Sequence, residues 1–240
     1  MGAGALVVAD DAAGLAREAA EWLAGVLMAK AGPSAVCLSG GSTPRLLYEL
    51  LARAPLVGRV PWDRVHWFWG DERFVPPGDA RSNYRMAMDA MLGHVPAPRG
   101  MVHGVPTVGV TPAEAALRYA AELQGFYGAS VLDAERPLFD VVLLGLGTNG
   151  HTASLFPGEA VLGERVAWAA AATPAGEATR ITLTYPVLES CRHAAFLVVG
   201  ADKRAVMARV RAGGSGLPAE AYRPVGALHW FADRAAAGGA

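Results

Sequence analysis

Residues 34–51 read SAVCLSGGSTPRLLYELL, and their pattern indicates the class of fold. The first five residues are apolar enough for a strand buried on both faces, and the leucines after Pro44 are spaced for one face of a helix. Gly40 and Gly41 allow a tight turn between the two, with Thr43 predicted to cap the helix. We therefore expect a strand, a glycine turn and a helix, the unit from which parallel sheets are built.

The same alternation of short apolar runs and helical patterns continues along the chain. The apolar runs predict further strands at residues 65–69, 139–144, 181–184 and 194–199. Periodic apolar positions predict helices at residues 11–30, 83–92, 113–127 and 203–211. No repeat or linker interrupts the pattern. We therefore expect a single α/β domain over residues 1–240, with an open, mostly parallel sheet and helices on both faces.

Composition narrows the classes of function. The chain has 240 residues, of which 52% are hydrophobic and 18% charged, so it can bury a large core and is not a disordered protein. A net charge of -1 gives no reason to expect nucleic acid as a partner. No apolar run is long enough to span a membrane, and the acidic N-terminus is unlike a secretory signal. Two cysteines form no disulfide framework or metal-ligand spacing, which favours the cytoplasm.

Ligands of open α/β sheets bind beyond the carboxyl ends of the strands, so the loops there are the places to look for chemistry. In the first such loop, Gly40, Gly41, Ser42 and Thr43 precede a helix N-terminus, where backbone N–H groups and the helix dipole favour an anion such as phosphate. The alternative is a capped glycine turn that binds nothing. No Gly-Lys-Ser follows, which disfavours a nucleoside triphosphate.

The other two loops carry titratable side chains. GDERFVPP, from residue 70, places Asp71 and Arg73 at a strand end, either as part of an active site or as a surface ion pair. FDVVLLGLGTNGHTASLFPG, from residue 139, contains the spacing G-x-G-x-x-G of a dinucleotide site. Pro157 stops any long helix there, which disfavours that interpretation. His151, in a polar glycine loop at a strand end, is instead a candidate general base.

With these three loops, the chain resembles the 6-phosphogluconolactonase family. The resemblance rests on LSGGSTP, WGDERFVP with SNYR, and GLGTNGHTASLFPG, and it continues through RITLTYP and VVGADK to the C-terminal region. It implies the fold shared with glucosamine-6-phosphate isomerases. It also implies hydrolysis of 6-phospho-D-glucono-1,5-lactone to 6-phosphogluconate, the second step of the pentose phosphate pathway, with no metal or organic cofactor.

The resemblance also implies roles for individual residues. The family's general base falls on His151, its active-site arginine on Arg73, and its phosphate-binding loop on residues 40–43. Arg180 and Lys203, otherwise ordinary residues at the start of a strand and a helix, would add positive charge for the phosphate. The chain departs from the family at Asn149, where an Asp usually orients the histidine. Two outcomes stay open: a reduced rate, or compensation by a neighbour such as Asp71. The family implies no partner beyond the sugar phosphate, and we expect a monomer or a weak homo-oligomer.

Three alternatives remain open at this stage. A glucosamine-6-phosphate isomerase or deaminase shares the first loop, although such enzymes carry GHIAFNE where this chain has GHTASLF. A non-catalytic sugar-phosphate-binding module is kept open by Asn149. A dinucleotide oxidoreductase is the third. Within the hydrolase interpretation, Ser42 or Ser154 as a covalent nucleophile is disfavoured, since neither lies in a G-x-S-x-G elbow.

Overall fold

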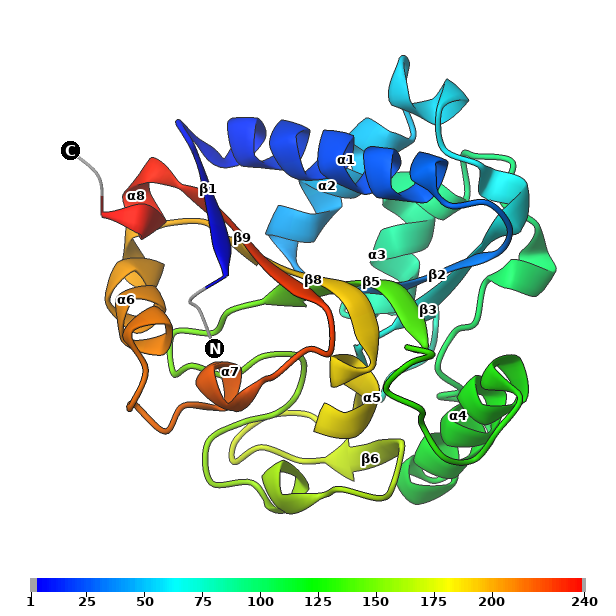
Figure 1. The fold of residues 1–240 in the computed structure, drawn as a ribbon. Helices are drawn as coiled ribbons and strands as arrows, with labels where there is room; N and C mark the ends of the chain where they lie inside the picture. Colours follow the sequence, from blue (N-terminus) through cyan, green and yellow to red (C-terminus); the bar gives the residue numbers. More distant parts are fainter. Residues whose placement is uncertain (1–3, 239–240) are drawn as a thin grey trace.

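The computed structural model describes residues 4–238 and contains a six-stranded, fully parallel sheet (Figure 1). In spatial order its strands are β1 (Ala5–Ala9), β9 (Ala227–Asp233), β8 (Cys191–Val198), β5 (Phe139–Gly145), β2 (Ser34–Leu38) and β3 (Val65–Trp69). The central strands β2 and β5 are buried along almost their whole length, as their continuous apolar runs predict. The α/β class and the mostly parallel sheet are therefore confirmed.

A second, three-stranded antiparallel sheet lies beside the first. Its strands are, in spatial order, β4 (Asp71–Arg73), β7 (Arg180–Leu183) and β6 (Ala169–Ala172). Only Gly70 separates β3 from β4, and its N–H donates to Leu38 of the large sheet while its carbonyl accepts from Leu183 of the small one. The small sheet thus holds β4 and β7 next to the strand ends of the large sheet.

Helices cover both faces of the large sheet, with α1 and α2 above it and α4, α5 and α7 below it in Figure 1. The helices are α1 (Ala12–Ala29), α2 (Ser42–Leu51), α3 (Asn83–Ala87), α4 (Pro112–Tyr127), α5 (Tyr185–Glu189), α6 (Arg204–Ala212), α7 (Pro218–Ala221) and α8 (Arg234–Ala237). The helix predicted over residues 83–92 is α3, followed by one π-helical turn over Met88–Leu92. Among the described residues, no helix is long and apolar enough to cross a bilayer.

Two predictions about local structure are wrong, and four strands were not predicted. The apolar run at residues 181–184 belongs to the antiparallel sheet, not the parallel one. Helix α2 begins at Ser42 with Gly41 as its N-cap, so Thr43 is a helical residue and not the cap. Gly41 has φ 108°, a conformation that glycine adopts without strain, and this lets the helix start two residues earlier than predicted. The strands β1 and β9 of the large sheet and β4 and β6 of the small sheet were not predicted.

Candidate active site

A hollow of about 210 Å³ opens where the carboxyl ends of β2 and β5 meet the small sheet. Polar side chains from six different segments converge on it, as expected at the strand ends of an α/β sheet. Its lining consists of Ser39, Gly40, Asp71, Arg73, Asn83, Gly145, Leu146, Gly147, His151, Ala153, Arg180 and Lys203. Six residues predicted for the site, namely Gly40, Asp71, Arg73, His151, Arg180 and Lys203, are therefore brought together.

The remaining predicted residues lie outside this lining. Gly41, Ser42 and Thr43 form the cap and first turn of α2, and the first two of them are exposed. Asn149 contacts His151 from beside the hollow. Ser154, considered above as a nucleophile, is fully buried and its hydroxyl donates to Asp71 Oδ2 at 2.6 Å.

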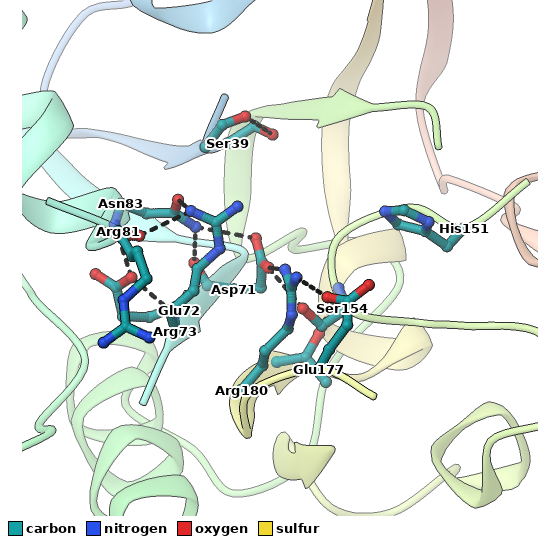
Figure 2. Close-up of polar contacts among 12 residues, drawn as sticks. Ser39, Asp71, Glu72, Arg73, Arg81, Asn83, His151, Ser154, Glu177 and Arg180 are labelled. Carbon is teal, nitrogen blue, oxygen red and sulfur yellow. Dashed lines mark hydrogen bonds and ion pairs between the residues drawn. The ribbon is translucent and has the colours of Figure 1, made fainter. Parts of the chain in front are cut away.

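Strand β4 presents alternate side chains to opposite sides. Asp71 and Arg73 line the hollow, whereas Glu72 lines a separate depression behind the strand. Asp71 is buried, and besides Ser154 it faces Arg180, whose Nη1 lies 3.8 Å from Oδ2 (Figure 2). A carboxylate is therefore fixed at the base of the site.

Arg73 is held by the segment that opens α3. Its Nη1 donates to Asn83 Oδ1 at 2.9 Å and to the Arg81 carbonyl at 2.8 Å (Figure 2). Asn83 in turn donates from Nδ2 to the Asp71 carbonyl at 2.9 Å. Gly40 permits this arrangement, because a Cβ there would lie 1.9 Å from Asn83 Oδ1. The glycine loop at Gly40 therefore packs directly against Asn83, the residue that holds Arg73.

His151 sits in a turn shaped around its ring. A Cβ on Gly147 would lie 2.1 Å from His151 Nδ1, so only glycine leaves room for the imidazole. The Asn149 side-chain carbonyl lies 2.6 Å from Nδ1 and also accepts the His151 backbone N–H at 3.2 Å. Because a carbonyl oxygen cannot donate, Nδ1 must carry the proton in this contact. The neutral imidazole then has a free lone pair on Nε2, as a general base requires.

The surroundings of His151 favour its neutral form. Burial lowers the pKa of His151 below its ordinary value of 6.5, and Arg180 and Lys203 act in the same direction. Asp71 and Glu177 oppose these effects by raising the pKa. The ring also stacks on Phe156, with centroids 4.2 Å apart. At neutral pH the side chain is therefore able to accept a proton.

Arg180 and Lys203 supply positive charge at the same hollow. Arg180, which opens β7, forms an ion pair with Glu177 and lies over the Phe156 ring, 5.4 Å from its centroid. Among the described residues, Arg180 Nε and Arg73 Nε are buried without a hydrogen-bond partner. An unpaired buried donor costs free energy, so each arginine carries one unsatisfied N–H beside the hollow.

Sequence reasoning missed Ser39, Asn83 and Glu177. Asn83 is the first residue of α3 and follows the N-cap Ser82. Nothing local in the sequence marks Asn83 or Glu177 as neighbours of an arginine. Between residues 4 and 238, no group of three or more His, Cys, Asp and Glu residues is arranged to hold a metal ion.

Residues 10–230 match the family model of glucosamine-6-phosphate isomerases and 6-phosphogluconolactonases. A 6-phosphogluconolactonase from Nostoc is 41% identical over 208 residues, which cover 85% of this chain and 84% of the relative. The structure of a 6-phosphogluconolactonase from Trypanosoma cruzi matches with a TM-score of 0.87 at 27% identity, over 99% of this chain and 97% of that one. A monomeric glucosamine-6-phosphate deaminase matches with a TM-score of 0.82 at 18% identity, over 98% and 99%, and shows the fold alone.

The parallel sheet, with a histidine and three cationic side chains gathered at its strand ends, defines an α/β protein with a candidate site for an anionic ligand. The family model matches residues 10–230, and the Nostoc relative is 41% identical over 85% of the chain, so the family within this class is also defined. The chain belongs to the glucosamine-6-phosphate isomerase/6-phosphogluconolactonase family.

Proposed function

We propose that the protein hydrolyses 6-phospho-D-glucono-1,5-lactone to 6-phospho-D-gluconate, in the second step of the pentose phosphate pathway. Its relatives at 39% and 41% identity, from Synechocystis and Nostoc, are 6-phosphogluconolactonases. The observation that carries the proposal is the pairing, in one hollow, of a neutral histidine with three cationic side chains. A base and a phosphate site are what this hydrolysis requires. The substrate is the one partner that we propose.

The reaction begins with a water molecule placed between His151 and the lactone carbonyl. Nε2 of His151 takes a proton from this water as its oxygen attacks the carbonyl carbon, which forms a tetrahedral oxyanion. Arg73, together with backbone N–H groups of the glycine loop, stabilises the negative charge on that oxygen. The bond from carbon to the ring oxygen then breaks, and the ring oxygen takes the proton back from Nε2. The product acid ionises at neutral pH, so each turnover releases one proton.

Binding of the distant phosphate orients the reacting end of the substrate. Arg180 and Lys203 hold the phosphate, and the binding energy of this contact is used to place the carbonyl near His151. Asp71 has two roles in this arrangement. It keeps Arg180 directed into the hollow. Its charge also raises the pKa of His151, which is part of what a carboxylate at position 149 does in other members of the family.

The alternatives are weakened by specific contacts. Gly147 and Gly150 pack against His151 and Leu217, and a short turn follows His151 where a dinucleotide site needs a helix N-terminus. In the segment after His151, the acid of the deaminase sequence GHIAFNE falls on Phe156, an apolar residue that stacks on the His151 ring. A sensor would need neither the neutral imidazole nor the Nδ1 contact with Asn149.

A coupled assay tests the proposal against these alternatives. Glucose-6-phosphate dehydrogenase generates the lactone in place, and its disappearance is followed with and without the protein. We expect hydrolysis well above the spontaneous rate, and no release of ammonia from glucosamine 6-phosphate. Binding of 6-phosphogluconate without turnover of the lactone would instead identify a sensor. We expect the protein to act in the cytoplasm, as a monomer or a weak homo-oligomer.

Replacement of Lys203 by alanine should weaken substrate binding more than catalysis. Loss of one charged contact to the phosphate should raise KM about tenfold and leave kcat within about threefold. The dependence of KM on salt should also become shallower. Steady-state kinetics at two ionic strengths measure both effects. Arg209→Ala, an exposed cation on helix α6, is the matched control and should behave as wild type. An unchanged KM for Lys203→Ala would remove Lys203 from the phosphate site.

Replacement of Asn149 by aspartate should shift the pH dependence of the enzyme. A carboxylate beside Nδ1 favours the charged imidazole, so it raises the pKa of His151 and moves the acid limb of kcat/KM to higher pH. An exchange that imposes the wrong histidine tautomer lowers the rate about 10⁴-fold in a catalytic triad. Because Asn149 already selects the productive tautomer of His151, Asn149→Asp should change kcat/KM on the alkaline plateau far less than that. A pH profile of kcat/KM from pH 4 to 9 measures both. An acid limb that does not move would show that residue 149 has no electrostatic influence on the base.

A further inference from the structure

Glu72 is a buried carboxylate that the mechanism above does not use. Only 2% of its surface is exposed, and it points away from the hollow that Asp71 and Arg73 line. A buried acid without a cationic partner is costly, so its contacts need an explanation. None of its hydrogen-bond partners is a charged group.

Four donors surround the two oxygens of Glu72. Oε1 accepts the backbone N–H groups of Arg73 at 2.8 Å and of Asn83 at 2.7 Å. Oε2 accepts the backbone N–H of Tyr84 at 2.7 Å and the hydroxyl of Ser82 at 3.0 Å. Two of these donors are the backbone N–H groups of Asn83 and Tyr84, the first residues of α3, which have no partner within the helix, and a third is the hydroxyl of its N-cap Ser82. Glu72 therefore fastens β4 to the start of α3.

The segment that Glu72 fastens is the one that holds the Arg73 guanidinium. Arg73 Nη1 donates to the Arg81 carbonyl and to Asn83 Oδ1, which lie on either side of Ser82 in the sequence (Figure 2). The backbone N–H of Asn83 donates to Glu72, and its side-chain oxygen accepts from Arg73. A shift of this segment would therefore move the acceptors that aim the guanidinium.

We propose that Glu72 is a positioning residue for hydrolysis, whose carboxylate locks the 81–84 segment and through it sets the direction of the Arg73 guanidinium. The inference rests on the proposed function, since it assigns Arg73 to the oxyanion. Glu72 touches neither the hollow nor the substrate. It acts only through Arg73 and Asn83.

The chemistry of the site requires a carboxylate rather than an amide. Burial raises the pKa of Glu72 above its ordinary value, and the hydrogen bonds from Tyr84, Asn83, Arg73 and Ser82 limit this rise because they stabilise the charged form. An amide has only one acceptor oxygen, so its NH₂ group would take the place of either Oε1 or Oε2. At Oε1 the NH₂ would face the N–H groups of Arg73 and Asn83, and at Oε2 it would face the Tyr84 N–H and the Ser82 hydroxyl. Glu72→Gln would therefore leave at least one buried N–H without an acceptor and loosen the segment.

A double-mutant cycle with Arg73 tests the proposal. We expect Glu72→Gln to lower kcat about tenfold or more with KM within about threefold, because a small misplacement of a catalytic group costs rate rather than binding. In an Arg73→Ala background the same exchange should change kcat by less than about twofold, since residues that act through one another are not additive. Thermal unfolding of each variant establishes that it is folded.

Two further variants complete the design. Glu114→Gln is the matched control, because Glu114 also accepts hydrogen bonds at the start of a helix, in the capping box of α4, outside the lining of the hollow. It should leave kcat unchanged. Ser82→Ala removes one donor to Glu72 and leaves the three backbone contacts. If Glu72→Gln does not fold, Ser82→Ala should still lower kcat, and this loss should also vanish in the Arg73→Ala background.

The outcomes separate this inference from the proposed function. Wild-type kcat in folded Glu72→Gln, or an equal loss with and without Arg73, would overturn the positioning role. If the wild-type protein hydrolyses no lactone, the proposed function fails, and side-chain NMR of the Arg73 guanidinium still decides the inference. We expect restricted rotation in wild type and faster rotation in Glu72→Gln. Equal rotation rates would contradict the proposal.

Discussion

His151→Ala should lower kcat for lactone hydrolysis by about 10²–10⁴-fold, the usual contribution of a general base. The loss should fall on kcat, because the phosphate contacts through Arg180 and Lys203 remain. The variant also loses the stacking on Phe156, so binding of 6-phosphogluconate is the measurement that shows an intact site. We expect that affinity to change by less than about threefold, since product binding depends mainly on its phosphate.

The matched control for this variant is His94→Ala. His94 is exposed, and its ring contacts the Asp89 carbonyl outside the hollow. It should retain wild-type kinetics. Retention of full activity by His151→Ala would remove the general base from the mechanism, and the remaining candidate for activation of water would then be Asp71.

Arg73→Ala should lower kcat about 10²–10³-fold, as the loss of one preorganised donor to an oxyanion does. Arg73 is fixed by Asn83 and the Arg81 carbonyl before the substrate arrives, so no reorganisation is needed when negative charge develops. Arg73→Lys keeps the charge but loses the planar guanidinium, and should recover only part of the rate. Arg53→Ala, an exposed arginine in the turn after α2, should have no effect.

The values of kcat and KM for Arg73→Ala also test whether Arg73 acts on the oxyanion. If Arg73→Ala raised KM about as much as Lys203→Ala and left kcat unchanged, Arg73 would belong to the phosphate site and not to the oxyanion. The glycine-loop N–H groups would then stabilise the oxyanion without a cationic side chain.

Much of the fold could be predicted because the central strands are buried on both faces. A strand such as residues 34–38 carries a continuous apolar run, and this pattern has one explanation in an α/β chain. β1 has an exposed edge and a mixed pattern, and β6 is a run of four alanines with no strand signature. Which sheet a strand joins depends on partners distant in sequence, so the antiparallel pairing of β4 with β7 could not be foreseen.

The residues of the candidate site also differ in how far local sequence could identify them. His151 and Arg73 could be identified from glycine-rich or charged loops at strand ends, where local sequence already indicates chemistry. Arg180 and Lys203 were chosen through the family resemblance, and the structure places both at the hollow. The role of Glu72 could not be read from the sequence, because its partners at residues 82–84 become neighbours only when β4 packs against α3.

The near-neutral net charge of -1 conceals a polarised site. Three cationic side chains converge on one hollow, and the acids that balance them are divided between its base, its rim and the remote surface. The charge balance disfavours nucleic acid as a partner but says nothing against a small anionic ligand. A chain with this composition can therefore select a sugar phosphate.

The most direct test of the account is a titration of the acid released from freshly prepared 6-phosphogluconolactone at pH 7. Each hydrolysed molecule yields one proton, so the rate of base addition reports the reaction without a coupling enzyme. We predict that wild-type protein releases acid far faster than the enzyme-free blank, and that His151→Ala approaches the blank. Equal rates with and without the wild-type protein would contradict the assignment of this protein as a lactonase.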